Sequence, residues 1–399
     1  MSEPIRLLTF STLYPNAAQP THGVFVENRL RQLLGSGQAM AQVLAPVPWF
    51  PSAAPRFGAW AAFARAPRAE TRHGIQIAHP RFPVIPKLGM PLAPWLLYRA
   101  VLPHARRVAA EAGAQAIDAH YMYPDGVAAV WLGHALGLPV VITARGTDVN
   151  LIPRYALPRR LIQGAIAGAA ALVAVSAALG EALTALGAPP GKVTVLRNGV
   201  DLTLFRPPAD RDAARAALGL TGPTLLSVGH LIARKGHDLA IAALAGLPGW
   251  SLLILGEGPE RARLEALAAA PALAGRVRLL GARAHADLPA IYGAADALVL
   301  ASAREGWANV LLEAMACGTP VVASDIWGNP EVVRAPQAGR IVARTPAAIA
   351  DGVRDLAAAR PDRAATRAYA EGFGWEPTTA GQLALFRRVI AEARETAGR

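Results

Sequence analysis

Cysteine is almost absent from this chain, which has 399 residues and one cysteine, Cys317. A single thiol excludes an intrachain disulfide and is typical of proteins in a reducing compartment. Cys317 stands among the small residues that end a predicted helix, where a buried structural thiol is expected more often than a nucleophile. The fold is therefore expected to be held by an apolar core, in a cytoplasmic protein.

Charged residues are also scarce, at 17%, and the only lysines are Lys87, Lys192 and Lys235. Because 53% of the residues are hydrophobic, the composition excludes a disordered chain. This length predicts two domains of roughly 200 residues each. The formal net charge of +12 suits nucleic acid, anionic lipid or phosphorylated substrates. No nucleic-acid-binding motif is present, so nucleic acid is not an expected partner.

The sequence lacks a strongly apolar run of the ~20 residues that a spanning helix needs. Residues 164–180 come nearest, but they are mostly Ala and Gly and are interrupted by Ser176. We expect a helix, a buried strand and a second helix there. Residues 1–12 carry Glu3 and Arg6 before a short strand-like run, unlike a signal peptide. The protein is expected to be cytoplasmic, with at most a peripheral attachment at the inner face of the cytoplasmic membrane.

Short apolar runs alternate with amphipathic stretches along the chain, which is the pattern of βα units around parallel sheets. A linker at 206–208 and a connecting helix at 210–218 separate two such series, and a last helix is expected over 375–396. The prediction is an α/β protein with two Rossmann-like domains whose strand carboxyl ends share a cleft. The expected strands are 5–10, 41–45, 116–119, 140–143, 171–175 and 192–196, followed by 224–228, 251–255, 277–280, 297–300, 321–323 and 339–342.

Residues 46–107 break this alternation and mix aromatic with basic side chains. Prolines there disfavour one long continuous helix. Two interpretations stay open: an irregular insertion whose aromatics pack on the core, or a basic-aromatic face that touches anionic lipid or a lipid-linked acceptor, the second being slightly favoured. The residues are Trp49, Phe50, Phe57, Trp60, Phe63, Phe82 and Trp95, with Arg56, Arg65, Arg68, Arg72, Arg81, Lys87, Arg99, Arg106 and Arg107.

The most informative stretch starts at Glu305 and reads EGWANVLLEAMACGTPVV. It places Glu305 in a glycine-containing loop and Glu313 about one turn inside a helix that should begin near Asn309 and stop at Gly318. The amino end of that helix presents unpaired N–H groups and partial positive charge, which suit a phosphate. The flanking carboxylates can accept hydrogen bonds from hydroxyl groups. A nucleotide sugar, with phosphate between two hydroxyl-rich groups, fits this arrangement.

Two glutamates separated by seven residues also occur by chance on surface helices, but the complete stretch is more specific. It resembles the signature of the retaining glycosyltransferases of family 4, which have the two-domain GT-B fold. Their motif is Glu, seven residues and Glu, then Ala-Met-Ala-x-Gly-x-Pro-Val-Val, and many members have Gly where this chain has Ala308. The resemblance implies an acceptor-binding domain at 1–202, completed by a helix at 375–399 that crosses back to it. It also implies a donor-binding domain at 203–374.

The resemblance extends to the loop after the first strand of the second half. Gly229-His230-Leu231 and Lys235-Gly236 match the family's Gly-Arg-Leu and Lys-Gly, in which Arg and Lys hold the donor diphosphate. Cations at a strand end suit a diphosphate that gains charge as its sugar leaves, although a solvated basic turn is the alternative. His230 is a departure from the family, and Arg234 is expected to compensate for it.

Other loops of the second half resemble parts of the family's nucleotide site. Gly256-Glu257-Gly258 looks like its glycine turn, and Gly281-Ala282-Arg283 opens the loop whose backbone reads the base. The resemblance implies that Glu305 binds hydroxyls of the donor sugar and that Glu313 binds those of the ribose. The residues expected to bind the donor are Gly23, His230, Gly256, Gly258, Arg283, Gly306, Trp307, Asn309, Val310 and Glu313.

The first half carries weaker matches. Gly23 resembles a family glycine that lets the backbone approach the diphosphate. His120 ends a predicted strand where relatives often have His, although a lone His there is more often structural. Arg145-Gly146-Thr147-Asp148 corresponds to the family's His-Gly-x-Asp, but Arg145 stays protonated and is expected to bind an anion or sugar rather than act as a base. Arg145, Asp148 and Asn198, which opens an interdomain motif, are assigned to the acceptor side.

The resemblance implies a retaining glycosyltransferase that moves a sugar from a UDP- or GDP-sugar to a hydroxyl of a saccharide acceptor. The catalytic residues are expected to be Glu305, Lys235, Arg234 and His120. First-half features similar to bacterial teichuronic-acid and exopolysaccharide enzymes imply a lipid-linked acceptor in cell-surface polysaccharide or glycolipid biosynthesis. Neither a metal nor a cofactor is expected, because a helix end and cations can stabilise the leaving group. The alternatives are a nucleotide-sugar epimerase of the same fold and a non-catalytic nucleotide-sugar- or lipid-binding module.

Overall fold

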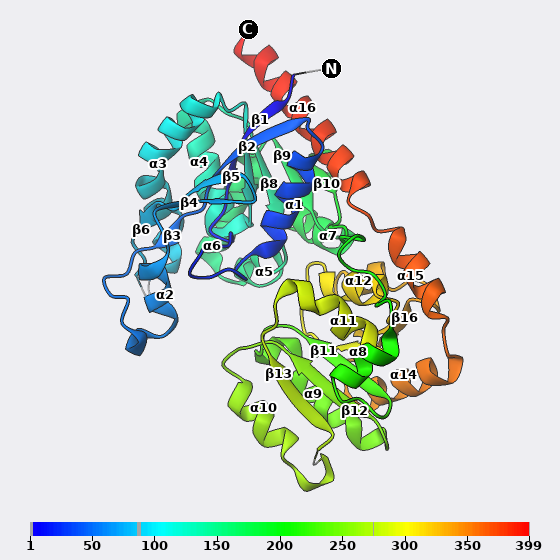
Figure 1. Ribbon diagram of the computed structural model, residues 1–399. Coiled ribbons are helices and arrows are strands. Elements are labelled where there is room, and N and C mark those ends of the chain that lie inside the picture. Colours follow the sequence, from blue (N-terminus) through cyan, green and yellow to red (C-terminus); the bar gives the residue numbers. More distant parts are fainter. Residues whose placement is uncertain (1–2, 86–88, 274, 399) are drawn as a thin grey trace. The chain divides into compact units, whose positions relative to one another are not determined.

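The computed structural model describes residues 3–85, 89–273 and 275–398 (Figure 1). The chain divides into two compact units. The first consists of Met1–Arg197 together with Pro377–Arg399, and the second of Asn198–Glu376. Lys87, one of the basic residues of the 46–107 segment, lies outside the described residues.

The described part of the first unit contains an eight-stranded sheet in the order β10-β9-β8-β7-β1-β2-β5-β4. All neighbouring strands are parallel except β4, which runs antiparallel to β5 at one edge. The six strands expected here are confirmed with small shifts at their ends, whereas β4, β5 and a separate pair, β3 with β6, were not predicted. The strands are β1 Ile5–Phe10, β2 Ala39–Leu44, β3 Val47–Pro48, β4 Ala69–Arg72, β5 Ile75–Ala78, β6 Arg81–Phe82, β7 Ala116–His120, β8 Val140–Ala144, β9 Ala171–Ala174 and β10 Val193–Val195.

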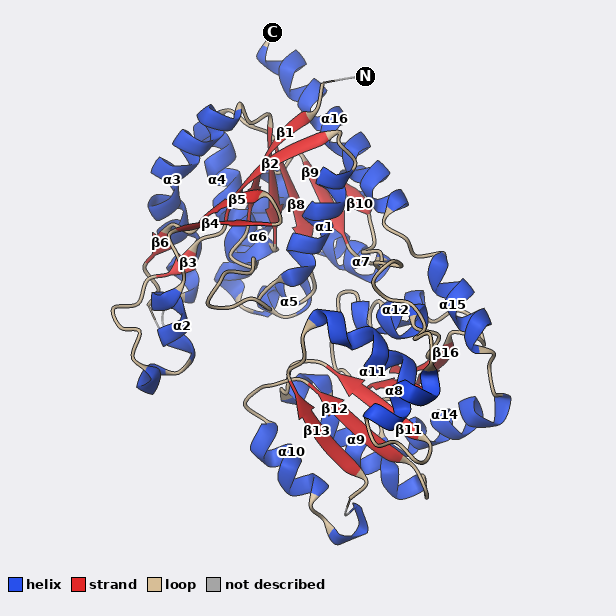
Figure 2. Cartoon of the chain, in the orientation of Figure 1, coloured by secondary structure: helices blue, strands red, loops and turns tan. Residues whose placement is uncertain are grey.

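Helices lie against this sheet (Figure 2), and α6, β9 and α7 confirm the helix, strand and helix expected around residues 164–180. The last helix, α16, completes the core: its Leu383, Phe386 and Val389 are buried with Leu7 and Val141 of the sheet. The crossing of the last helix back to the first domain is thereby confirmed. The helices are α1 Val24–Gly35, α2 Ala59–Arg65, α3 Ala93–Ala112, α4 Val127–Leu136, α5 Thr147–Asn150, α6 Ala156–Gly168, α7 Ala177–Ala185 and α16 Glu376–Ala397.

Within the described part of residues 46–107, the chain forms short strands and separate helices rather than one long continuous helix, as the prolines predicted. Helix α3, which begins in this segment, is nevertheless long. It runs for 20 residues and contains Pro103 in its interior. Pro94 lies in the first turn, where the missing N–H would have no intrahelical partner. Pro103 does remove one hydrogen bond, but Leu97 and Val101 are fully buried on the same face, and this burial offsets the loss.

The second unit contains, within its described residues, a six-stranded parallel sheet in the order β13-β12-β11-β14-β15-β16. This is the doubly wound Rossmann order, which reverses direction between the central strands β11 and β14. The predicted strands are confirmed: β11 Thr224–Val228, β12 Ser251–Leu255, β13 Val277–Gly281, β14 Ala297–Leu300, β15 Val321–Ser324 and β16 Gly339–Val342. The helices are α8 Arg211–Ala217, α9 His237–Ala243, α10 Arg261–Ala268, α11 Leu288–Ala294, α12 Asn309–Ala316, α13 Asn329–Val332, α14 Pro346–Ala359 and α15 Arg363–Glu371.

Candidate functional site

Lys235 and Glu305 meet at the point where the strand order of the second unit reverses. Lys235 follows β11 and Glu305 follows β14, so both come from the carboxyl ends of the two central strands. Lys235 Nζ donates a hydrogen bond to Glu305 Oε1 at 2.7 Å, and Arg234 NH1 lies 3.7 Å from Glu305 Oε2. Open α/β sheets bind ligands at such a switch point. The fold therefore brings three of the four predicted catalytic residues together at a place suited to a ligand.

The Glu305 carboxylate is held from several sides. Ser302 Oγ donates to Oε1 at 2.6 Å, and Glu305 is only 9% exposed. The loop that carries it is joined to the cation loop, because Arg234 NH1 donates to the Arg304 carbonyl at 2.6 Å. The two hydrogen bonds from Lys235 and Ser302 both reach Oε1. A carboxylate has about four acceptor positions, so Oε2 retains capacity for the hydroxyl groups of a ligand.

Helix α12 follows this loop with the predicted bounds. It begins at Asn309 and ends at Ala316, and Gly318 beyond it has a φ of 77°, the left-handed conformation that stops helices. The preceding residue, Ala308, supplies no side-chain cap. The first N–H groups of the helix therefore remain available to an anion. Asn309 does not use its side chain as a cap: its Oδ1 accepts a hydrogen bond from Asn198 Nδ2 at 3.3 Å.

Glu313 lies on the second turn of α12 and is part-buried. Tyr292 of α11 donates its hydroxyl hydrogen to Glu313 Oε2 at 2.7 Å. Removal from water raises the pKa of the Glu313 carboxyl to about 7, although the Tyr292 hydrogen bond acts in the opposite direction. Glu313 is thus a hydrogen-bond acceptor whose charge changes near neutral pH.

Trp307 and Asn198 are hydrogen-bonded to each other next to the Glu305 loop and α12. Trp307 is 7% exposed, and its ring nitrogen donates to the Asn198 carbonyl at 3.0 Å. Its ring centroid lies 6.4 Å from that of Phe373. Asn198, which the sequence assigned to the acceptor side, belongs to the second unit. Gly306 is buried beside Trp307, and Val310 lies in the first turn of α12.

Two glycines allow the loops after β11 and β12 to touch. Gly256 has a φ of 145°, and a Cβ there would lie 1.9 Å from the Gly229 carbonyl oxygen. A Cβ on Gly258 would lie 2.4 Å from the Leu231 carbonyl oxygen. Both positions therefore require glycine. The side chains of His230 and Arg283 are exposed on the neighbouring loops.

The first unit has a comparable reversal of strand order between β1 and β7. Asp125, which follows β7, connects the ends of these two strands. Its carboxylate accepts hydrogen bonds from Thr12 N at 2.6 Å and from Ser11 Oγ at 3.2 Å, and both of these residues follow β1. Burial raises the pKa of Asp125 to about 7. In the loop between β1 and α1, Gly23 has a φ of 68°, and a Cβ there would lie 2.3 Å from the Leu13 carbonyl oxygen. Gly23 is thus fixed as glycine by local backbone packing.

His120, at the end of β7, is the centre of a buried polar chain. Its Nε2 lies 3.2 Å from Asp118 Oδ2, and Arg145 NH2 donates to its Nδ1 at 2.7 Å. The arginine must donate, so the imidazole proton is on Nε2. Burial lowers the pKa of His120, and that of Arg145 to about 9. His120 is 1% exposed. The structure thus places this predicted catalytic residue in the interior of the first unit, with both nitrogens occupied.

Asp148 organises the turn that carries Arg145. Its fully buried carboxylate accepts hydrogen bonds from the backbone N–H groups of Met122 at 2.7 Å, Gly146 at 2.7 Å and Arg145 at 3.1 Å. Burial raises its pKa. The acceptor-side residues Arg145 and Asp148 therefore lie together beside His120, whereas Asn198 is in the other unit.

The 46–107 segment contains both inward-packed and exposed aromatics, and contact of the exposed ones with lipid stays a prediction. Phe50 and Trp60 pack together with ring centroids 5.6 Å apart. By contrast, Trp49 and Trp95 are 56% and 53% exposed. The guanidinium carbon of Arg99 lies 6.0 Å from the centroid of the Trp95 ring. We call the exposed group Trp49, Phe57, Val84, Ile85, Met90, Leu92 and Trp95, with Arg56 and Arg99, the aromatic-basic patch.

Comparison with known proteins assigns both units. Residues 42–204 match the family described as Glycosyltransferase Family 4, and residues 210–373 match the family described as Glycosyl transferases group 1. Together the two matches span most of the chain, and both families are described as glycosyltransferases.

Named relatives and solved structures agree with this family. D-inositol 3-phosphate glycosyltransferase from Mycobacterium tuberculosis is 38% identical over 221 residues, which are 52% of this chain and 46% of that protein. The chain thus spans about half the length of the curated relatives it matches. Sucrose-phosphate synthase from Thermosynechococcus elongatus superimposes with a TM-score of 0.79 at 23% identity, covering 98% of this chain and 100% of that one. Anabaena HepE in complex with UDP has a TM-score of 0.70 at 22% identity, with coverages of 98% and 100%. These likenesses confirm the predicted two-domain GT-B fold.

Two further expectations concern a membrane-spanning helix and a metal site, within the described ranges 3–85, 89–273 and 275–398. Across these ranges, no helix combines the length and apolar character needed to cross a membrane. Among the same residues, no three His, Cys, Asp or Glu side chains gather where they could hold a metal ion. Independence from metals and cofactors stays a prediction, as do the retaining mechanism and the similarity to teichuronic-acid enzymes.

Sequence reasoning on the glycosyltransferase site missed Tyr292, Ser302 and Asp125. Tyr292 and Ser302 contact the two motif glutamates, but neither lies in a recognisable motif. Asp125 stands in Tyr-Pro-Asp-Gly, which reads as an ordinary turn. The one feature of the sequence that indicated Asp125 is its position a few residues after a predicted central strand.

Proposed function

We propose that this protein is a retaining glycosyltransferase that transfers a sugar from a nucleotide-sugar donor to a hydroxyl group of a saccharide acceptor. The observation that carries the proposal is the convergence of Lys235 and Arg234 on Glu305 at the switch point of the second unit. Cations, a free helix amino end and hydroxyl-accepting carboxylates are the three kinds of group that a sugar linked to a diphosphate requires. We assign donor binding to the second unit and acceptor binding to the first.

In the proposed reaction, the bond between the sugar's anomeric carbon and the diphosphate oxygen breaks, and the nucleoside diphosphate leaves with the electron pair. The acceptor oxygen forms the new bond on the same face of the sugar. Its proton passes to the leaving phosphate oxygen. Lys235, Arg234 and the amino end of α12 stabilise the charge that develops on the diphosphate, so the reaction should need no metal ion. Glu305 and Glu313 hold hydroxyls of the sugar and of the ribose.

We propose a UDP- or GDP-sugar as donor. The solved structures named above support a nucleotide, since HepE is described in complex with UDP and, in another structure, with UDP-glucose. The proposed acceptor is a lipid-linked saccharide used in cell-surface polysaccharide or glycolipid synthesis. The name of the mycobacterial relative adds an inositol phosphate to the acceptors worth testing.

We also propose peripheral contact with an anionic membrane through the aromatic-basic patch. Exposed Trp49 and Trp95 can enter the headgroup region, while Arg56 and Arg99 pair with anionic lipid. Such contact would bring the first unit to a lipid-linked acceptor.

The test combines binding with product analysis. UDP-, GDP- and ADP-sugars are screened for thermal stabilisation of the wild-type protein, because a true donor binds the folded state. The stabilising donor is then incubated with and without saccharide acceptors, in EDTA and in excess Mg²⁺, and the products are examined by NMR. Transfer with retained anomeric configuration in EDTA supports the proposal. An isomerised sugar nucleotide formed without acceptor would identify an epimerase, and binding without transfer or hydrolysis would identify a non-catalytic module.

A further inference from the structure

Tyr292 is a fully buried side chain that ends at the Glu313 carboxylate. It is 1% exposed, and its hydroxyl donates to Glu313 Oε2 at 2.7 Å. One side of the ring packs edge-on against Phe205, with ring centroids 5.9 Å apart, and Phe205 in turn packs against His285 at 5.3 Å. A buried phenol with one hydrogen bond to a part-buried carboxylate has little freedom to reorient. Glu313 therefore has one oxygen fixed by protein and the other, Oε1, left for a further donor.

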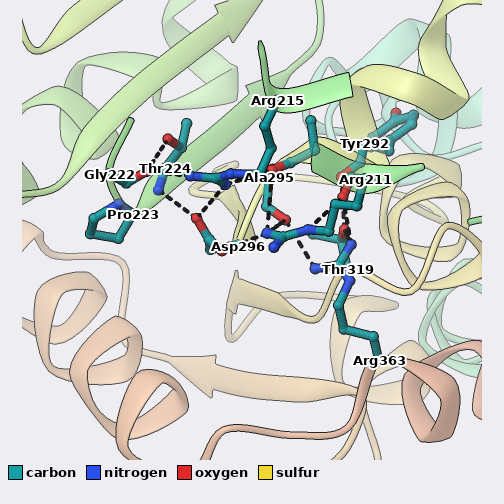
Figure 3. Close-up of polar contacts among 12 residues, drawn as sticks. Arg211, Arg215, Gly222, Pro223, Thr224, Tyr292, Ala295, Asp296, Thr319 and Arg363 are labelled. Atoms are coloured by element: carbon teal, nitrogen blue, oxygen red, sulfur yellow. Dashed lines mark hydrogen bonds and ion pairs between the residues drawn. The ribbon is translucent and has the colours of Figure 1, made fainter. Parts of the chain in front are cut away.

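The backbone of Tyr292 is fixed as firmly as its hydroxyl. Its carbonyl accepts a hydrogen bond from Thr319 Oγ1 at 2.7 Å, and Arg363 NH2 donates to that same oxygen of Thr319 at 2.7 Å (Figure 3). Thr319 is fully buried. Arg363 is thus linked to the Tyr292 backbone by two consecutive hydrogen bonds that share Thr319.

Three arginines also cap the carboxyl end of α11, the helix that carries Tyr292. Arg363 donates to the Gly293 carbonyl at 2.7 Å, and Arg215 donates to the Ala294 carbonyl at 2.9 Å. Arg211 adds a hydrogen bond to the Gly293 carbonyl at 3.2 Å. Asp296 pairs with Arg211 at 2.6 Å and with Arg215 at 3.1 Å, so the arginines are themselves held in place (Figure 3). Cations at a helix carboxyl end stabilise it, so this cap anchors α11 against the sheet.

We propose that Tyr292 is a positioning residue for the donor: it holds Glu313 in one orientation, so that the free carboxylate oxygen receives the ribose hydroxyls. This inference rests on the proposed function of the site. It assigns Tyr292 a part in nucleotide affinity without direct contact with the sugar that is transferred. The capping arginines act indirectly: they fix the end of α11, and α11 carries Tyr292.

The same contact also influences the charge of Glu313. Removal from water raises the pKa of this carboxyl to about 7, and the Tyr292 hydrogen bond opposes that rise. At the carboxyl end of α12, Arg367 donates to the Ala316 carbonyl at 2.8 Å, and burial raises the pKa of Cys317, which Arg367 and Arg363 act to lower. At the amino end, Lys235 and Arg234 pair with Glu305. Since an ionised carboxylate is the better acceptor of hydroxyl hydrogen bonds, nucleotide affinity should fall as pH drops below about 7.

The test is calorimetric titration of UDP, GDP and ADP into the wild type and three variants, between about pH 6 and about pH 8.5. The Tyr292→Phe variant removes only the hydroxyl, and Glu313→Gln removes the titrating charge. The matched control is Tyr369→Phe, which also removes a tyrosine hydroxyl of the second unit, a part-buried one that donates to the Val332 carbonyl at 2.8 Å. Melting temperatures of all four proteins establish that each is folded.

With Tyr292→Phe, the affinity should fall about tenfold at the acidic end for each unit by which the Glu313 pKa rises. The loss should shrink as the pH rises, while Glu313→Gln binds weakly at every pH and Tyr369→Phe follows the wild type. A Tyr292→Phe variant with wild-type affinity and an unshifted pH profile would overturn the inference. So would an equal loss at every pH that is shared by Tyr369→Phe. Failure of the wild type to bind any of the three nucleotides would instead overturn the proposed function.

Discussion

Lys235 Nζ lies 2.7 Å from Glu305 Oε1, and the two residues stand in the loops that follow the two central strands of the second sheet. Their side chains are mostly buried, with 16% and 10% exposure. A cation held in this way is oriented before any ligand arrives. It needs little reorganisation to meet the charge that a departing diphosphate develops.

Replacement of Lys235 by Ala should lower kcat/KM by about a hundredfold or more, because it removes one preorganised group from the leaving diphosphate. Steady-state transfer rates with the donor identified by thermal screening measure this loss. Lys192→Ala is the matched control, since Lys192 donates to the Ala167 carbonyl of the first unit. Equal activity of the two variants would contradict the role given to Lys235.

Replacement of Gly256 by Ala should destabilise the second unit by more than about 3 kcal/mol. The new Cβ would lie 1.9 Å from the Gly229 carbonyl oxygen, and the φ of 145° disfavours any side chain. Gly249→Ala also has a positive φ, of 78°, but meets no atom within 4 Å, so it should cost only about 1 kcal/mol. Chemical denaturation of both variants measures the difference. Similar losses would show that backbone contact between the two loops is not the cause.

Asp125 should make the first unit less stable as the pH rises. Its pKa is 3.8 in an unfolded chain and about 7 in the fold, because burial disfavours its charge. A raised folded-state pKa gives stability that is fully present below the unfolded pKa and is lost as the pH rises through about 7. The difference corresponds to at most about 4 kcal/mol.

The Asp125→Asn variant keeps an acceptor oxygen and cannot ionise. Between about pH 4 and about pH 8, the wild type should therefore lose unfolding free energy relative to this variant. Urea denaturation across that range provides the measurement, and Asn in place of the exposed Asp355 is the control. A constant difference between wild type and Asp125→Asn would rule out a raised pKa.

The aromatic-basic patch should bind vesicles that contain anionic lipid. Serine at both Trp49 and Trp95 should reduce co-sedimentation with phosphatidylglycerol vesicles several-fold, because these two rings are large, amphipathic and more than half exposed. Serine at Leu157, which is 48% exposed but lies outside the patch, is the control. Vesicle binding that is insensitive to the tryptophans but lost with Leu157 would place the contact elsewhere.

The sequence predicted the parallel strands and α12 closely, because buried parallel strands read as short apolar runs and because Asn309 and Gly318 bound the helix. It did not predict the edge strand β4 or its neighbour β5. Strand β4 alternates between exposed and part-buried positions and carries charged side chains, and β5 is only four residues long, so both resemble irregular loops in the sequence. Helix α3 was missed for another reason: local proline chemistry disfavours it, and only tertiary burial of its apolar face stabilises it.

For the site, the family motif located Glu305, Lys235 and Glu313, and the fold brought Glu305 and Lys235 into contact. The sequence could not reveal that Tyr292 reaches Glu313, because the two residues lie on different helices and meet only through packing. His120 shows the same limit, since its burial between Asp118 and Arg145 depends on neighbouring strands and loops. Contacts between site residues that are distant in the sequence could therefore be identified only from the structure.

Helix α16 places a constraint on how this chain acquires its fold. Leu383, Phe386 and Val389 share one core with Leu7 and Val141, so apolar surface made at the start of synthesis is covered by residues made almost four hundred positions later. While the ribosome is still translating the second unit, the apolar surface that α16 covers stays exposed. Cutting the chain after Arg197 would leave that surface exposed, whereas fusing residues 377–399 behind Arg197 would restore the residues that cover it.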